Sequence, residues 1–453
     1  MKNHIIIFIA IFSANVFTIQ AQSLEISQEV KENIKFRVDN DVSTGIVVGV
    51  VTPEGTNYFS YGVKSLKTNE AVDENSVFEI GSISKTFTGL LLADMVEKGE
   101  LNLEDQLQSI LPEGIIAPTR NGESIKLYQL SNHTSSLPRM PSNISMENPE
   151  NPYADYTEKQ MYDFLNNYEL TRDIGTELEY SNYAVGLLGD LLAAQHGVTY
   201  EELLMKSITQ PLGMDATRIH FTSKMKENLA KGHSGGVEVE NWDLSTLAGA
   251  GGIRSTAVDM LKYISAHIGL DTCTLSSAIQ LTHQSINNDA IGLGWFMNKK
   301  EEDNLIWHGG LTGGYATFTG FNKETKIGVV VLSNSNATID DIGMHILDST
   351  IELITPKLYT VVEVADSILE KYVGDYELAP GFILSVTKDG KQLNTQATGQ
   401  GVNPIYPESD TRFFLKVVDA QIEFNQNDQG EVESLTLFQA GYEINGEKMV
   451  ISK

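Results

Sequence analysis

Strand-forming stretches lie near both ends of the first 355 residues, and helical patterns fill the middle. Near the start, Gly45–Thr52 and Thr56–Tyr61 flank the turn residues Pro53-Glu54-Gly55. The later strand-like stretches are Ile291–Met297, Asn304–Trp307, Ala316–Phe321 and Ile327–Ser333. Because a sheet must bury an apolar face against another layer, the simplest closure is one antiparallel sheet built from both ends. The sequence therefore predicts an α+β domain over residues 22–360, with helices on the sheet and a helical subdomain between its two halves.

Apolar spacing and capping residues predict the helices of this domain. They are expected at residues 24–38, 83–98, 102–111, 158–167, 183–196, 256–267 and 340–354. Residues 113–160 are rich in proline and lack a regular pattern. An irregular segment inside a compact chain is often a substrate-binding surface.

The pattern changes after residue 365, where short stretches with period-two alternation follow one another. They are Phe382–Thr387, Lys391–Gln396, Phe413–Val418, Gln421–Phe424, Ser434–Phe438 and Lys448–Ile451. Asp389-Gly390 between the first two is a strong signal for a two-residue hairpin. The pattern of residues 365–453 therefore predicts a separate small β domain, which could be a barrel.

The first 21 residues resemble a secretory leader. Lys2 and His4 precede the apolar run Ile5–Phe12, and small residues near Ala21 suit cleavage there. A buried N-terminal strand is the alternative interpretation. The apolar run is too short to span a bilayer, so we expect a periplasmic or extracellular protein without an integral membrane segment after cleavage. The single Cys273 excludes an internal disulfide framework.

The chain is acidic, with 60 acidic and 32 basic residues and a net charge of −28. Nucleic acid needs a basic footprint, so nucleic-acid binding is not expected. The nine histidines show no paired metal-ligand spacing, so neither a metal site nor another cofactor is predicted. We expect a monomer that acts on a small-molecule substrate.

The stretch Phe78–Phe87 carries the candidate chemistry. A strand-like approach ends at Gly81, Ser82 follows at the mouth of a helix, and Lys85 shares the face of Ser82 one turn later. A lysine can activate a hydroxyl when burial lowers its pKa, and the apolar helix that follows would bury this pair. The bare Ser-x-x-Lys pair is weak evidence, since it recurs at Ser223/Lys226 and at Ser385/Lys388 in polar or β-hairpin contexts.

Two further segments could complete a site. Tyr180-Ser181-Asn182 opens an apolar helix, where a phenol could relay protons and an amide could hold substrate. Trp307-His308-Gly309-Gly310-Leu311 ends a strand-like stretch, where glycines allow close approach and a backbone N–H could join an oxyanion hole. Taken singly, the first is more often a chance helix start, and the second a tight turn with a surface histidine. Gly232–Gly236 matches the nucleophile-elbow pattern but lacks the apolar strand before it and the helix after it, so we reject it.

Together, the three segments resemble the serine β-lactamase and penicillin-binding protein superfamily, and most closely class C β-lactamases with their peptidase and esterase relatives. Phe78–Lys85 fits the class C active-site signature, Tyr180-Ser181-Asn182 matches Tyr-x-Asn, and His308-Gly309-Gly310 stands in the place of Lys-Thr-Gly. The resemblance covers roughly residues 35–355.

The resemblance implies that Ser82 forms an acyl-enzyme, that Lys85 and Tyr180 share acid–base duty, and that Asn182 binds a substrate amide. It also implies an oxyanion hole from the N–H groups of Ser82 and Leu311. His308 and Gly309 replace the lysine and threonine usual in lactamases, and His in this place is common among esterase-like and peptidase-like relatives. The leading hypothesis is an exported hydrolase that opens β-lactam rings. The alternatives are a D-amino-acid peptidase or a small-ester esterase using the same site, and a non-catalytic penicillin-binding sensor.

Overall fold

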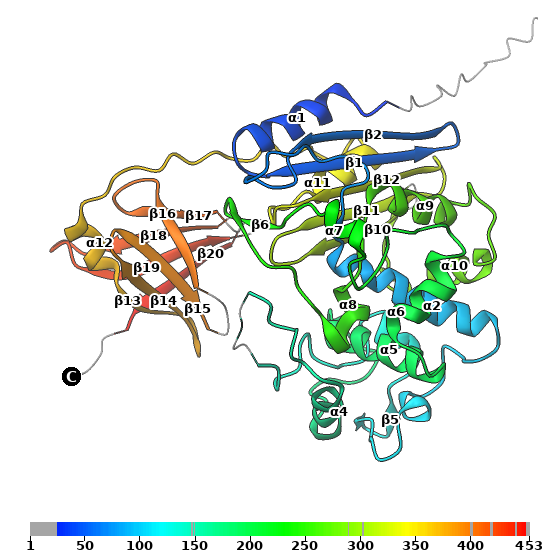
Figure 1. Cartoon of the computed structure of the whole chain (residues 1–453). Helices are drawn as coiled ribbons and strands as arrows, with labels where there is room; N and C mark the ends of the chain where they lie inside the picture. Colours follow the sequence, from blue (N-terminus) through cyan, green and yellow to red (C-terminus); the bar gives the residue numbers. More distant parts are fainter. Residues whose placement is uncertain are drawn as a thin grey trace, which may run out of the picture.

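The computed structural model describes residues 25–145, 148, 150–288, 290–300, 303–398, 402–416, 420–439 and 442–449. It consists of a larger body and a smaller barrel, joined by the extended segment between helices α11 (Asp340–Leu347) and α12 (Asp366–Tyr372) (Figure 1). The predicted leader, residues 1–21, lies outside the described residues.

One six-stranded antiparallel sheet forms the centre of the larger body, in the order β2-β1-β12-β11-β10-β9. Its strands are β1 Gly45–Thr52, β2 Gly55–Gly62, β9 Phe296–Lys300, β10 Asp303–Leu311, β11 Ala316–Asn322 and β12 Ile327–Ser333. Strand β1 pairs with β12, with Ile46 opposite Ser333 and Val51 opposite Gly328. The prediction of a sheet built from both ends of the domain is confirmed.

Helices cover both faces of this sheet, which is why β1, β11 and β12 are buried along their whole length. Val48 and Val331 pack with α1 (Gln28–Asp39) and α11 (Asp340–Leu347) on one face. Val47 and Val330 face the opposite core with α2 (Ser84–Glu97) and α9 (Ala257–Ile268). Period-two alternation along the strands thus divides the interior into two layers.

Helix α2 runs through the interior of the larger body, and every residue from Ser84 to Met95 is buried. At Gly89 a Cβ would lie 2.3 Å from the carbonyl oxygen of Leu293, so only glycine allows this contact. The other helices and short strands are β3 Phe78–Glu79, β4 Thr119–Arg120, β5 Glu123–Ser124, α3 Leu127–Ser131, α4 Glu158–Asn167, α5 Asn182–Gln195, α6 Tyr200–Leu204, α7 Ser223–Glu227, β6 His233–Ser234, β7 Val237–Glu238, α8 Ala248–Gly251, β8 Arg254–Ser255 and α10 Ser276–Thr282.

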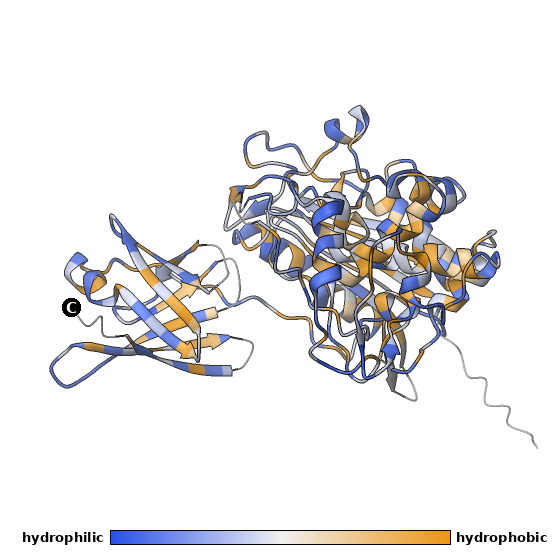
Figure 2. Cartoon of the chain, turned by 90° about the horizontal axis from the view of Figure 1, so that it is seen from below, coloured by the Kyte–Doolittle hydropathy of each residue, from blue (hydrophilic) through white to orange (hydrophobic). Residues whose placement is uncertain are grey.

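The C-terminal strands close into an eight-stranded barrel in the order β13 to β20. After α12 (Asp366–Tyr372) come β13 Gly374–Ala379, β14 Phe382–Asp389, β15 Gln392–Ala397, β16 Val402–Pro407, β17 Arg412–Leu415, β18 Ala420–Gln426, β19 Val432–Gln439 and β20 Tyr442–Lys448. The hairpin at Asp389-Gly390 is present, with Gly390 at φ +56°. Apolar and polar residues alternate along the barrel strands (Figure 2), and the apolar ones form a separate core around Tyr372 and Phe424.

Several predicted elements differ in the structure. Residues 102–111 form only a 3₁₀ turn at Leu107–Ile110, because the Asp105 side chain accepts the Asn102 N–H in a local turn. The strand expected at Ile291–Met297 begins at Phe296, since Gly294 at φ +77° passes against the carbonyl of Lys85. The last helix of the larger body ends at Leu347 rather than Ile354.

Two barrel strands, β13 and β16, were not predicted, and the six predicted strands have different bounds in the structure, most of all β17 and β20. Strand β17 ends at Leu415 and β20 runs over Tyr442–Lys448. Residues 417–418 and 450–451 of the predicted strands lie outside the described residues.

Candidate active site

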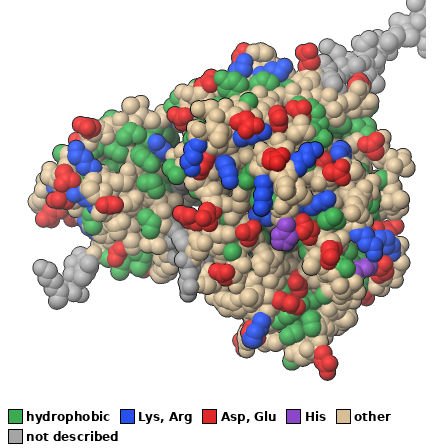
Figure 3. Space-filling model, viewed as in Figure 1, with side chains coloured by type: hydrophobic (Ala, Val, Ile, Leu, Met, Phe, Trp, Pro, Cys, Tyr) green, Lys and Arg blue, Asp and Glu red, His purple; other side chains and the backbone are tan. Residues whose placement is uncertain are grey.

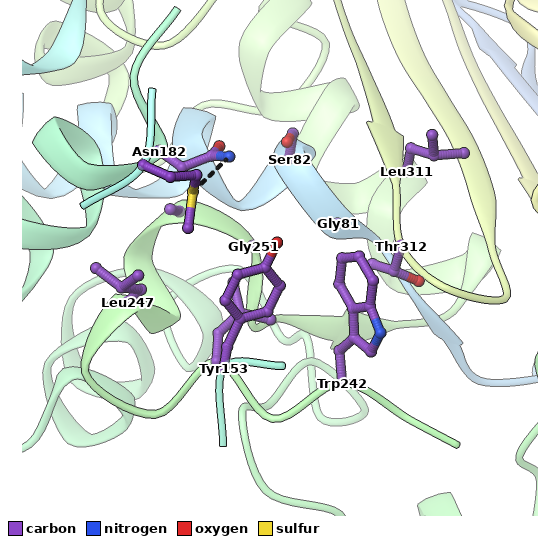
Figure 4. Close-up of a pocket in the computed structure, with 12 residues that line it drawn as sticks. Gly81, Ser82, Tyr153, Asn182, Trp242, Leu247, Gly251, Leu311 and Thr312 are labelled. Carbon is purple, nitrogen blue, oxygen red and sulfur yellow. Dashed lines mark hydrogen bonds between the residues drawn. The ribbon is translucent and has the colours of Figure 1, made fainter. Parts of the chain in front are cut away.

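Ser82 lies in a single 3₁₀ turn, Gly81–Ile83, between β3 and the buried helix α2. Gly81 has φ +51°, and a Cβ on it would lie 2.9 Å from the backbone nitrogen of Leu311. Glycine therefore lets the turn meet the end of β10 and leaves the Ser82 side chain facing a pocket (Figure 4).

Lys85 follows one turn later, and its side chain is fully buried. Its Nζ lies 3.0 Å from Ser82 Oγ and donates to the carbonyl of Ala250 at 2.6 Å. Burial lowers the pKa of Lys85 well below its ordinary value, and the positive charge of Arg139 adds to the effect. A neutral amine next to a serine hydroxyl is a suitable proton acceptor.

Tyr180 is positioned by the start of α5. Ser181 caps this helix by accepting the N–H of Ala184, and its hydroxyl donates to the carbonyl of Pro138 at 2.6 Å. Burial raises the pKa of Tyr180 to about 12, while the neighbouring Ser82 side chain and the positive charge of Arg139 oppose the rise. The phenol therefore keeps its proton at neutral pH and can donate it.

Asn182, the first residue of α5, presents its side-chain amide to the same pocket, with Nδ2 3.4 Å from Met140 Sδ (Figure 4). The structure thus brings Ser82, Lys85, Tyr180 and Asn182 together from the starts of two helices far apart in the sequence. Their catalytic roles stay predictions.

His308 lies within β10 with only 3% of its surface exposed, so the alternative of a surface histidine in a tight turn is wrong. Its Nδ1 lies 2.6 Å from the carbonyl oxygen of Gly309 and donates to it, which leaves Nε2 without a proton. Burial, with the neighbouring Lys85 acting in the same direction, lowers the pKa of His308 to about 3. His308 is therefore neutral, and β10 supplies no cation where related lactamases have a lysine.

Gly310 and Leu311 bring the end of β10 against the Ser82 turn. A Cβ at Gly310 would lie 2.1 Å from the carbonyl oxygen of Ile80, and the Thr317 hydroxyl donates to that oxygen at 2.9 Å. This contact holds Leu311, which lines the pocket next to the Ser82 turn (Figure 4).

Replacing Gly310 by alanine is expected to lower kcat/KM by about 100-fold, because the methyl group must push β10 away from Ser82 and misplace the Leu311 N–H. Hydrolysis of a p-nitrophenyl ester measures the loss, and circular dichroism checks that the variant is folded. A folded variant with activity within threefold of the unmodified protein would contradict this role for the close contact.

Sequence reasoning missed four residues around this site: His133, Arg139, Tyr153 and Trp242. His133 accepts the Ser181 N–H through Nδ1 at 3.2 Å, and its ring lies tilted against the Tyr180 ring with centroids 4.4 Å apart. Tyr153 and Trp242 form an edge-to-face pair with centroids 5.1 Å apart in the pocket wall. His133, Arg139 and Tyr153 come from the irregular segment 113–160, so the proline-rich pattern was the available signal.

The rejected motif at Gly232–Gly236 forms a hairpin, with Gly235 and Gly236 as the turn between β6 and β7, and not a strand-to-helix elbow. Within the described ranges, no group of three or more His, Cys, Asp or Glu could hold a metal ion. No helix in the described part of the chain is long and apolar enough to cross a membrane. Lys and Arg side chains are interspersed with Asp and Glu over the face in Figure 3.

This fold, with a serine beside a buried lysine and a tyrosine, defines a serine hydrolase of the penicillin-binding type. The chain belongs to the Beta-lactamase family, whose model matches residues 30–346. A second model, a domain of unknown function (DUF3471), matches residues 360–453, which contain the barrel.

Three known proteins illustrate the range of relatives. D-alanyl-D-alanine-carboxypeptidase/endopeptidase AmpH of Escherichia coli K12 is 29% identical over 310 residues, covering 64% of this chain and 79% of AmpH. A β-lactamase of the same strain is 26% identical over 351 residues, covering 69% of this chain and 89% of the enzyme. The octameric penicillin-binding protein homologue from Pyrococcus abyssi matches the fold with a TM-score of 0.63 at 22% identity, covering 92% of this chain and 99% of that one.

Proposed function

We propose that this chain is an exported hydrolase that opens β-lactam rings through an acyl-enzyme on Ser82. The observation that carries the proposal is the buried Lys85 Nζ, 3.0 Å from Ser82 Oγ. Export is proposed from the leader-like residues 1–21.

The pKa of Lys85 is lowered and that of Tyr180 is raised, and these opposite shifts suggest which residue accepts a proton and which donates one. Lys85, with its lowered pKa, takes the Ser82 proton as the oxygen attacks the carbonyl carbon. Tyr180, with its raised pKa, donates a proton to the leaving nitrogen as the C–N bond breaks, and the Lys85 ammonium then passes its proton to the Tyr180 phenolate. The backbone N–H groups of Ser82 and Leu311 would stabilise the oxyanion, an effect worth about 3–4 kcal/mol for each donor. Water then hydrolyses the ester on Ser82 and restores the hydroxyl.

A second candidate substrate class is peptides that end in D-amino acids, or small esters. The neutral His308 favours it, because the strand cation that attracts a lactam carboxylate in related enzymes is missing. The name of AmpH, a D-alanyl-D-alanine-carboxypeptidase/endopeptidase, is consistent with this candidate.

Turnover of three substrates separates the candidates: a chromogenic cephalosporin, a short p-nitrophenyl ester and a D-Ala-D-Ala peptide. Fast hydrolysis of the cephalosporin supports the β-lactam proposal. Hydrolysis of the peptide or ester alone would replace it with the second candidate. A stable adduct on Ser82 without turnover of any substrate would indicate a sensor.

Replacing His308 by lysine is expected to raise the ratio of cephalosporin to ester turnover by about tenfold, since an ammonium group there would attract the lactam carboxylate and stabilise the Tyr180 phenolate. The kcat/KM values for both substrates measure the ratio, with His308→Gln as the neutral control. If the lysine variant kept the original ratio, His308 would not decide substrate choice.

A further inference from the structure

Arg139 places a guanidinium at the active site that the chemistry above does not use. It lies over the Tyr180 ring, 5.1 Å from the ring centroid, and Lys85 Nζ lies 4.8 Å from the same centroid. The Arg139 side chain is exposed, in contrast to the buried Lys85. A cation is thus presented to solvent beside the phenol that would protonate the leaving group.

The backbone of Arg139 is fixed to the helix that carries the site. Its carbonyl accepts the N–H of Asn182 at 3.0 Å and the N–H of Tyr183 at 3.3 Å. The preceding carbonyl, of Pro138, accepts the Ser181 hydroxyl. Arg139 therefore keeps its place relative to Tyr180 and Asn182, although it belongs to an irregular segment.

The charge of Arg139 is not neutralised within the described part of the chain. Some half-exposed arginines have carboxylate partners, Arg120 with Asp173 and Arg172 with Glu179, whereas no described carboxylate pairs with Arg139. Burial favours the neutral forms of both Lys85 and His308. Arg139 is therefore the permanent cation among the side chains assigned to the site, and its planar fork suits a carboxylate.

We propose that Arg139 binds a carboxylate on the leaving-group half of the substrate, and that this chain selects acyl compounds carrying an anion there. The inference rests on the proposed acyl transfer to Ser82 and narrows its substrate class. Because the guanidinium lies over the Tyr180 ring, a carboxylate bound to it would be next to the residue that protonates the leaving group. Arg139 thus supplies the attraction that the neutral His308 cannot.

Two aryl esters with one acyl group test this inference, one releasing 3-hydroxybenzoate and the other releasing phenol. They differ by a single carboxylate on the leaving group. We expect Arg139→Gln to lower the ratio of kcat/KM for the carboxylate ester over the neutral ester by about 30-fold, mainly through KM. Arg139→Lys should keep part of the preference. Lys206→Gln removes one charge from an exposed position that does not line the pocket and should leave both esters unchanged.

A proportional loss on both esters would overturn the inference and leave Arg139 as a positioning residue for Tyr180. An unchanged preference in folded Arg139→Gln would overturn it as well. Failure of the acyl-enzyme proposal gives a different result, because Ser82→Ala would then still hydrolyse both esters.

Discussion

Replacing Ser82 by alanine is expected to reduce kcat/KM by about 10⁴-fold or more on any substrate that the unmodified protein turns over. Without the hydroxyl no acyl-enzyme forms, and loss of a catalytic nucleophile costs this much or more in comparable hydrolases. The free energy of unfolding should change little, because Ser82 is only partly buried and its side chain caps neither the 3₁₀ turn nor α2. Steady-state kinetics and urea denaturation measure the two effects.

Ser223→Ala is the matched control, because Ser223 and Lys226 repeat the Ser-x-x-Lys spacing on the short helix α7, where both residues are exposed. It should keep full activity. An active Ser82→Ala, or a loss of activity in Ser223→Ala, would show that the wrong serine has been assigned.

Replacing Lys85 by methionine should lower acylation by about 10³-fold or more and also stabilise the fold, with the free energy of unfolding at pH 7 rising by about 1 kcal/mol. Methionine fills a similar buried volume without an amine to desolvate. Lys85→Met also removes the hydrogen bond to the Ala250 carbonyl. We still expect a gain in stability, because burial is the largest influence on the Lys85 pKa and methionine has no amine to bury.

The pH dependence of this stability gain follows from the direction of the shift. Because the pKa of Lys85 is lower in the folded state, the unfolded chain binds more protons between the folded pKa and 10.5. The stability contribution of Lys85 therefore rises with pH across that window, and the advantage of Lys85→Met should shrink. Denaturation curves at several pH values measure this, with Lys226→Met as the exposed control. A destabilised Lys85→Met at pH 7, or an advantage that grows with pH, would contradict the burial argument.

Much of the architecture followed from local patterns. The strand-like apolar runs Gly45–Thr52 and Ile327–Ser333 identified the paired strands, and the Thr256 cap with Asp259 identified the start of α9. Asp389-Gly390 identified a barrel hairpin. These signals lie within a few residues of the element that they specify, so they can be recognised without knowing the fold.

Features that depend on distant contacts were not predictable. Strand β13 begins at Gly374 with φ +151°, and β16 contains Pro404, so neither has the composition of a regular strand. The burial of His308 depends on β9 and on Phe296, whose ring lies 5.1 Å away. Arg139 gains its place only because Asn182 and Tyr183 bind its carbonyl. The motif residues of the site could therefore be predicted from the sequence. The residues that bury them and shift their pKa values, such as Arg139, could not.

Intact-mass measurement of the protein after brief exposure to a β-lactam or an activated ester, followed by peptide mapping, tests the central claim directly. We predict a mass increase of one acyl group per chain, located on the peptide containing Ser82 and absent from Ser82→Ala. Acid quenching stops deacylation before the sample is analysed. Turnover without an adduct on the Ser82 peptide would contradict acyl transfer to Ser82, and so would an adduct on another residue.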